Sequence, residues 1–149
     1  MPITNTLGSY SIGRDTQVVV MHPLAPGGRL DLPGVTDFDV KPVYDQIKSK
    51  RLDGNVIEAA VPAGYTVTFN VDRAGPALND LQALIDAAFH VGGTVYGATV
   101  FQYVQEPNGS TSVYQFTDCS FQVTDLGHNT PDAVVKQSVN MTANRMVRV

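Results

Sequence analysis

The clearest pattern in the sequence is the stretch Tyr65-Thr66-Val67-Thr68-Phe69-Asn70-Val71-Asp72. Aromatic and β-branched apolar residues occupy every second position, and polar residues occupy the positions between them. Because successive side chains of a strand point to opposite faces, this alternation predicts a half-buried β-strand. A shorter strand over Val56 to Ala60 is expected before it, with Pro62-Ala63-Gly64 as the turn between the two.

The pattern changes to a helical period after this strand. Gly75-Pro76 is a suitable start, since proline is tolerated in the first turn of a helix. Apolar residues then recur mostly at three- and four-residue steps, as on the buried stripe of an amphipathic helix: Leu78, Leu81, Ile85, Ala88 and Phe89. Gly92-Gly93 supplies a left-handed C-terminal cap. One α-helix is therefore predicted over about residues 76–91.

The rest of the chain has the character of an antiparallel sheet. Residues 1–15 predict an extended N-terminal arm, and Asn108-Gly109 predicts a hairpin turn. The apolar parity changes near Thr117-Asp118, which indicates a bulge or bend. Further strands are expected at Val18 to Met21, Val35 to Val40, Thr94 to Gln105, Thr111 to Thr124 and Val135 to Ala143. We predict a mainly β fold, an antiparallel β-sandwich or barrel with one flanking α-helix, in a single domain of residues 1–149.

Residues 41–54 interrupt this pattern. They form the most charged stretch of the chain and follow neither the strand period nor the helix period. Apolar residues such as Tyr44, Ile47 and Leu52 nevertheless lie among the charges. A long loop of this composition is usually functional or disordered, so we expect an ordered loop that docks onto another surface.

Composition narrows the classes of function. The net charge is −4, and the basic residues are scattered except for Lys48, Lys50 and Arg51, which argues against tight binding of nucleic acid. The single cysteine, Cys119, excludes an intrachain disulfide. The N-terminus lacks the layout of a signal peptide, and no apolar run reaches the roughly 18 to 20 residues of a membrane helix. We expect a soluble protein made in the cytoplasm, with no membrane partner. The low charged fraction of 16% favours a surface partly buried against other subunits.

Motifs that carry catalysis or metal binding do not occur in the sequence. It has no phosphate-binding glycine loop, no zinc-protease motif and no nucleophile elbow. The histidines His22, His90 and His128 lack ligand spacing. Asp37 and Asp39 share a strand face, where paired acids are more typical of a solvated edge or a subunit contact than of an acid–base dyad. We therefore predict a non-enzymatic protein with no catalytic residues, no cofactor, no metal and no small-molecule substrate.

The order of these elements resembles that of bacteriophage tail tube proteins over roughly residues 16–148. Phe38-Asp39-Val40-Lys41 is followed by the charged segment ending in Leu52-Asp53-Gly54, then by the strand that closes on Asp72-Arg73. The amphipathic helix with Gly92-Gly93 comes next, and the last strand ends in Asn144-Arg145. The same ring design is shared by the type VI secretion tube and by other contractile injection devices.

The resemblance implies a structural subunit in the tail of a virion, made and assembled in the cytoplasm of a bacterial host. Such subunits self-assemble into rings, generally of six, and the rings stack into a tube through which double-stranded DNA is ejected without sequence recognition. It also implies sheath, baseplate hub and tape-measure proteins as partners.

The resemblance also suggests two sets of site residues. The segment 41–54 matches the loop that bridges neighbouring subunits or rings, which assigns inter-subunit contacts to Lys41, Tyr44, Ile47, Lys48, Lys50, Arg51, Leu52 and Asp53. The polar face of the last long strand could line the lumen of the tube, or could be an ordinary solvated strand face; it comprises Lys136, Ser138, Asn140, Thr142 and Asn144.

Two alternatives remain open. One is a type VI secretion tube or a baseplate ring protein of the same fold. The other is a monomeric ligand-binding β-barrel, whose pocket would be lined by the aromatic residues Phe101, Tyr103, Tyr114 and Phe116. The monomer should remain small at high concentration and should not depend on residues 41–54.

Overall fold

The computed structural model describes residues 16–30 and 35–149. The expected N-terminal arm, residues 1–15, lies outside the described residues. The described part has the following order: β1 (Thr16–Met21), the 3-10 turn η2 (Pro26–Gly28), β2 (Arg29–Leu30), β3 (Val35–Lys50), β4 (Val56–Asp72), α1 (Ala77–Gly92), β5 (Gly97–Gln105), β6 (Thr111–Asp125), β7 (Lys136–Ala143) and β8 (Arg145–Arg148).

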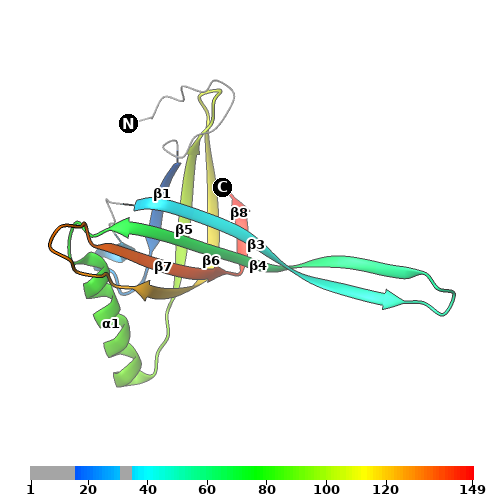
Figure 1. Ribbon diagram of the computed structural model, residues 1–149, viewed down its shortest axis with the longest axis horizontal. Coiled ribbons are helices and arrows are strands. Elements are labelled where there is room, and N and C mark those ends of the chain that lie inside the picture. The colour runs from blue at the N-terminus through cyan, green and yellow to red at the C-terminus, as the bar shows by residue number, and fades with distance from the viewer. Residues whose placement is uncertain (1–15, 31–34) are drawn as a thin grey trace.

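The strands form one antiparallel sheet of eight strands, in the order β2-β1-β5-β6-β7-β4-β3, with β8 paired to β6 off this path. Figure 1 shows β1 and β5 running across the direction of β3, β4 and β7. The long strand β6 joins the two parts, since it pairs with β8 before its bend, with β7 beyond it and with β5 on both sides of it. At the bend, Asp118 has a φ of 52°, and the register with β5 shifts between Ala98 and Val100. The predicted bulge and the predicted mainly β fold with one helix are both confirmed.

The core lies against the alternating stretch of β4. Val67, Phe69 and Val71 are fully buried, while Thr68 and Asn70 lie on the opposite face. Across β7, Val67 pairs with Met141 and Phe69 with Val139, and both partners are buried as well. Burying a side chain of this size stabilises the fold by about 1.5–3 kcal/mol. The stretch therefore anchors the half of the sheet from which the surfaces described below extend.

The helix α1 occupies the predicted position and ends as predicted. Gly93 has a φ of 64°, and its N–H donates to the Phe89 carbonyl at 2.7 Å. The first half of the apolar stripe is buried at Leu78 and Leu81, and Ile85 is half-buried. Phe89 was expected on the same stripe, but its side chain is 53% exposed because the second half of the helix is less covered than the first.

The expectation of a loop at residues 41–54 is wrong. β3 continues through Lys50 and pairs with β4 residue by residue, so these residues form most of a hairpin whose turn spans Arg51 to Asn55. The separate strand expected at Val56 to Ala60 is also the first part of β4. We call residues 42–63 the arm, which extends far to one side of the sheet (Figure 1). Its residues are all exposed, so it shows none of the burial that produces a visible strand period.

The arm joins the sheet at an irregular point. The register between β3 and β4 shifts between Val43 and Tyr44, which pair with Gly64 and Pro62. Gly64 has a φ of 114°, and a Cβ there would lie 2.6 Å from the Ala143 carbonyl oxygen. Only glycine therefore lets β4 pass this closely along the end of β7.

Candidate assembly surfaces

The arm is amphipathic. Directly opposed residues of an antiparallel pair lie on the same face, and the pairs Asp45–Val61, Ile47–Ala59 and Ser49–Ile57 therefore share one side. Three apolar side chains of this side are largely uncovered: Ile47 is 56% exposed, Ile57 45% and Val61 43%. We call Ile47, Ile57, Ala59 and Val61 the apolar arm face.

The opposite side of the arm carries Lys48, Lys50 and Glu58, whereas Asp45 lies on the side of the apolar arm face. Lys48 pairs with Glu58 across the strands, and Lys48 Nζ lies 3.2 Å from Glu58 Oε1. Lys50 lies farther along this side, and Arg51 begins the turn. Neither residue forms an ion pair within the part of the chain that the structure describes. These cations are therefore available to an external carboxylate.

A hairpin of this kind is not self-sufficient. Two isolated strands are at best marginally stable in water, and three or more strands or a covering element are needed for independent stability. The turn is held locally, since the Arg51 N–H donates to the Asn55 carbonyl at 2.8 Å and Asp53 Oδ1 accepts from the Asn55 N–H at 3.0 Å. Along the strands the apolar face has no cover among the described residues. This arrangement suits a surface that is completed by another protein.

The contact residues expected from the sequence all lie on or beside the arm, but they do not form one patch. Lys41 lies at the base, where its Nζ is 3.4 Å from Asp39 Oδ2. Tyr44, Lys48 and Lys50 lie on the charged side and Ile47 on the apolar side, while Arg51, Leu52 and Asp53 form the tip. Sequence reasoning missed the β4 half of the apolar face, Ile57, Ala59 and Val61. Their alternation with Val56, Glu58 and Ala60 is a weak signal that could have revealed it.

A second candidate surface is the outer face of β7 and its neighbours. Lys136, Ser138, Asn140 and Thr142 lie on this face, opposite the buried Gln137, Val139, Met141 and Ala143. Register places them beside Asp72, Asn70, Thr68 and Thr66 of β4. Asn144 lies beyond β7, where its N–H donates to the Thr117 carbonyl at 3.0 Å, so the structure separates it from the other four.

The side chains of this face bind one another. Ser138 Oγ donates to Asn70 Oδ1 at 2.7 Å, and Thr68 Oγ1 donates to Asn140 Oδ1 at 3.3 Å. Lys136 Nζ lies 3.1 Å from Asp72 Oδ1. The network reaches β3, where Asp37 Oδ2 accepts from Asn70 Nδ2 at 3.3 Å. We call the outward residues of β3, β4 and β7 the polar sheet face: Asp37, Asp39, Lys41, Thr66, Thr68, Asn70, Asp72, Lys136, Ser138, Asn140 and Thr142.

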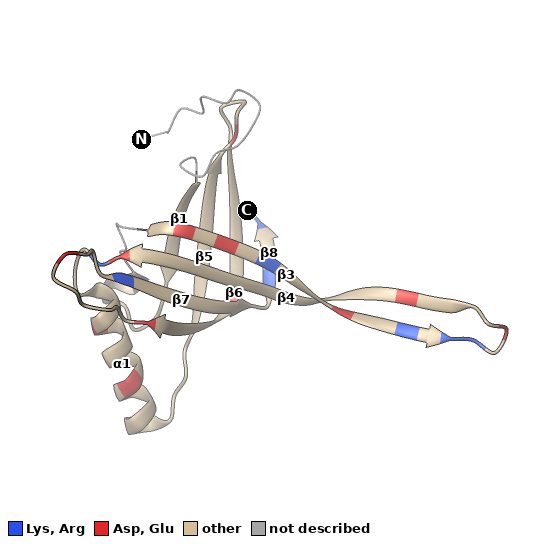
Figure 2. Ribbon diagram, in the orientation of Figure 1, with Lys and Arg blue, Asp and Glu red and all other residues tan. Residues whose placement is uncertain are grey.

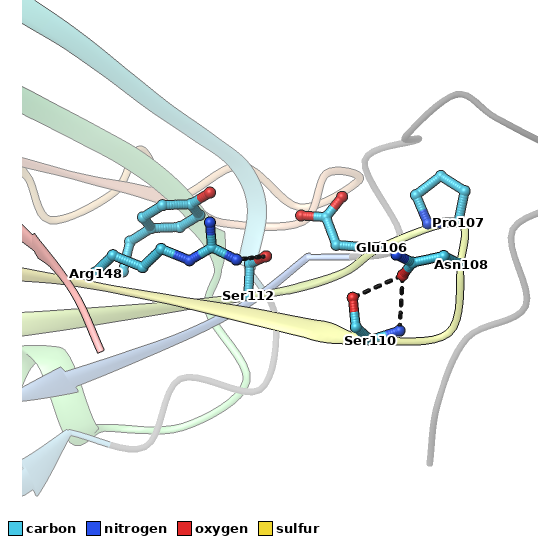
Figure 3. Close-up of a pocket in the computed structure, with 7 residues that line it drawn as sticks. Glu106, Pro107, Asn108, Ser110, Ser112 and Arg148 are labelled. Carbon is cyan, nitrogen blue, oxygen red and sulfur yellow. Dashed lines mark hydrogen bonds between the residues drawn. The ribbon is translucent and has the colours of Figure 1, made fainter.

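The pocket in Figure 3 offers little support for the ligand-binding alternative. It has a volume of about 420 Å³ and lies at the hairpin between β5 and β6. Arg148 Nη2 donates to Ser112 Oγ at 3.3 Å, and the Arg148 guanidinium carbon lies 6.0 Å from the centre of the Tyr114 ring. Of the four aromatic residues expected to line a pocket, Tyr114 alone lines this one, and Phe116 is fully buried in the core. The pocket is lined by Glu106, Pro107, Asn108, Ser110, Ser112, Tyr114 and Arg148.

The buried reactive groups are held in unreactive forms. Burial lowers the pKa of His22, whose Nδ1 accepts a hydrogen bond from the Leu24 N–H at 3.1 Å. Burial, with a smaller contribution from the neighbouring Asp118 and against a backbone hydrogen bond at Val100 that lowers it, raises the pKa of the Cys119 thiol to about 11. Within residues 16–30 and 35–149, no three His, Cys, Asp or Glu side chains gather as a metal site would require. No helix of the described chain has the length and apolar character to cross a membrane.

Comparison with known proteins finds similar structures but no similar sequence. No protein-family model matches the sequence, and no curated protein sequence matches it. Among solved structures, a chain of the sheath–tube complex of PVC, an extracellular contractile injection system in its extended state, has a TM-score of 0.61. It is 12% identical, and the match covers 99% of both chains.

Two further structures resemble the chain over most of its length. The SPP1 tail tube has a TM-score of 0.54 at 12% identity, covering 93% of this chain and 78% of that one. A chain from the tail of an empty gene transfer agent particle has a TM-score of 0.53 at 11% identity, covering 94% of this chain and 99% of that one. The chain thus has, over nearly its full length, the fold of phage and gene transfer agent tail tube proteins and of contractile injection system proteins.

Proposed function

We propose that the chain is a non-enzymatic structural subunit of a tail tube, which self-assembles into stacked rings around a central conduit. The observation that carries this proposal is the arm, a long amphipathic hairpin whose apolar face is uncovered on the single chain. The fold shared with the SPP1 tail tube and with the PVC sheath–tube complex makes other copies of the chain the natural partners.

Ring formation follows from the shape of the subunit. An arm on one side that packs against a different surface of the next copy makes a heterologous contact, which closes into a ring or continues as a helix. A ring of six copies is proposed, since the gene transfer agent tail was computed with C6 symmetry and the AFP baseplate was 6-fold symmetrised. Stacking of such rings would give the tube.

We assign the lumen to the polar sheet face. It carries three aspartates and two lysines, and both lysines have a carboxylate oxygen within 3.4 Å. Phosphates would find no cluster of free cations on it, so double-stranded DNA could slide past without being held. The hydrogen-bonded side chains also offer few unsatisfied groups to a passing polymer. This assignment supports a DNA conduit in a bacteriophage tail.

A tube of an extracellular contractile injection system is the second candidate, because the TM-score with the PVC chain, 0.61, exceeds that with the SPP1 tail tube, 0.54. In either case a sheath could surround the tube, as in the PVC sheath–tube complex. A baseplate hub would bind the end of the tube, and a tape-measure protein would lie in its lumen. The proposed location is the tail of a virion or of an injection particle, assembled in the bacterial cytoplasm. A type VI secretion tube or a baseplate ring protein remains the further alternative.

Negative-stain electron microscopy of the purified chain at increasing concentration tests the proposal. We expect rings or hollow tubes with an axial pore. A matched variant lacks residues 46–60, with Asp45 joined to Val61 by Asn-Gly, which makes a tight two-residue hairpin turn. Because the removed residues are all exposed, the variant should fold and should remain monomeric. A wild-type chain of 16.0 kDa that stays monomeric at every concentration would refute the proposal.

A further inference from the structure

A second uncovered apolar surface lies on the flank of α1. Leu84, Ala87 and Val91 follow at three- and four-residue steps, which places them along one side of the helix beside the buried stripe. Leu84 is 45% exposed, Val91 is 91% exposed, and Ala87 between them is exposed as well. We call these three residues the helix stripe. No described residue covers it.

The helix stripe and the apolar arm face match in length and shape. Leu84 to Val91 spans about 10 Å at 1.5 Å per residue. Ile57 to Val61 on the arm spans about 13 Å at 3.3 Å per residue. Ala87 is smaller than the two residues that flank it, so branched side chains such as Ile47 and Ile57 could pack against it.

One charge at the arm tip complements the charge of the helix. α1 carries Asp80 and Asp86 and contains no Lys or Arg, and Arg51 begins the turn at the arm tip (Figure 2), whereas Lys48 and Lys50 lie on the side opposite the apolar arm face. Asp80 lies one helical turn before Leu84 and so extends the line of the helix stripe. Neither Asp80 nor Arg51 forms an ion pair with the described residues.

The arrangement of the chain excludes contact between the two surfaces of one copy. The arm and α1 extend from opposite ends of the sheet in Figure 1. Each strand of the arm is about 30 Å long at 3.3 Å per residue, and both point away from the helix. Contact therefore requires a second copy, in which the arm of one chain meets the helix of the next.

We propose that the apolar arm face packs on the helix stripe of a second copy, with Arg51 at the tip of the arm beside Asp80 of that copy. The partner that covers the helix stripe is a second copy of the chain because the chain is proposed to self-assemble, and this inference rests on that proposal. The inference adds the acceptor surface: the outer flank of α1 receives the arm, and the contact repeats head to tail around or along the assembly.

A pair of variants tests the acceptor surface on α1. Ala87→Asp places an unpaired carboxylate in the centre of the helix stripe, while Ala133→Asp places the same group at an exposed position in the loop before β7, outside the helix. Both should fold with the melting temperature of the wild type. Ala87→Asp should need about tenfold or more higher concentration to form rings or tubes, measured by sedimentation and electron microscopy, and Ala133→Asp should assemble as the wild type does.

A disulfide test reports the contact directly. The double variant Ile57→Cys with Leu84→Cys should form an oxidised ladder of trimers and larger species on a non-reducing gel, because each copy then links to two neighbours. Each single variant can form dimers at most, and the buried Cys119 should remain reduced. Rings that form normally in Ala87→Asp, or assembled double variant without a ladder, would overturn this inference alone. A wild type that never assembles would overturn the proposed function together with it.

Discussion

Replacing Gly64 by alanine should destabilise the subunit by roughly 2–6 kcal/mol. The added Cβ would lie 2.6 Å from the Ala143 carbonyl oxygen, and a backbone atom within a sheet cannot move away cheaply. Overpacking of this kind costs about 1–3 kcal/mol. The φ of 114° adds a further conformational cost of about 1–3 kcal/mol for a residue with a side chain. Whole domains are stable by only about 5–15 kcal/mol, so the loss should be plainly measurable.

Gly54→Ala is the matched control. Gly54 also has a positive φ, 90°, but a Cβ there meets nothing within 4 Å. Its strain also lies at the tip of the arm, where local fraying can relieve it without unfolding the sheet. Urea unfolding followed by circular dichroism should therefore show a clearly lower midpoint for Gly64→Ala than for Gly54→Ala.

The comparison also bears on assembly. Gly64 lies where β4 leaves the sheet to form the arm, so displacement of β4 from Ala143 would change the direction of the arm as well as the stability. A Gly64→Ala variant should assemble less well than Gly54→Ala at temperatures where both are folded. Equal free energies of unfolding for the two variants, within about 0.5 kcal/mol, would show that the close approach to β7 does not constrain this position.

Three further predictions concern buried polar groups. Burial lowers the pKa of His22 in the fold, so the unfolded chain binds more protons than the folded chain below pH 6.5. The free energy of unfolding should therefore fall by up to about 1.4 kcal/mol per pH unit as the pH drops below that value. A His22→Asn variant should lose this part of the pH dependence, measured by urea unfolding from pH 7.5 to 5.5. An identical slope in the variant would contradict this reasoning. Gln137→Leu removes the Nε2 donor to Asn79 Oδ1 at 2.8 Å and to the Leu126 carbonyl at 2.9 Å, which should cost about 1–3 kcal/mol in the same assay, while Gln122→Leu at an exposed position should change little. Cys119 should resist a thiol reagent at pH 8 and react only after unfolding, because it is buried and its thiol pKa is about 11; rapid labelling of the native protein would show that this part of the core opens.

The sequence predicts those elements that have a buried face. Val67, Phe69 and Val71 alternate with polar residues because one side of β4 packs in the core, and that burial is what the period records. The start and cap of α1 are likewise local features, since Gly75-Pro76 and Gly93 act through their own backbone conformations. The outer face of β7 could be predicted from its buried opposite face.

The arm could not be predicted in the same way. None of its residues is buried, so no core packing requires one side to be purely apolar, and both sides contain polar residues. The register shift between Val43 and Tyr44 also interrupts the alternation along β3. The hydrogen-bond partners on the polar sheet face could not be predicted from the sequence either. The contacts of Asn70 with Asp37 and with Ser138 depend on the register of three strands that are far apart in the sequence.

On the core strands of this chain, the side chains that stabilise the fold and those that form the exposed surface lie on opposite faces. On β7, Val139 and Met141 hold the core while Asn140 and Thr142, one residue away, lie on the polar sheet face. The surface assigned to the lumen can therefore change its charge through exposed side chains without altering the packing beneath it. The arm differs, since it has no core side of its own. Its apolar residues add nothing to the stability of a single copy, and their exposure carries a risk of aggregation. The proposed self-assembly would cover these residues with a surface of another copy, so the proposed acceptor on α1 is the place to test it.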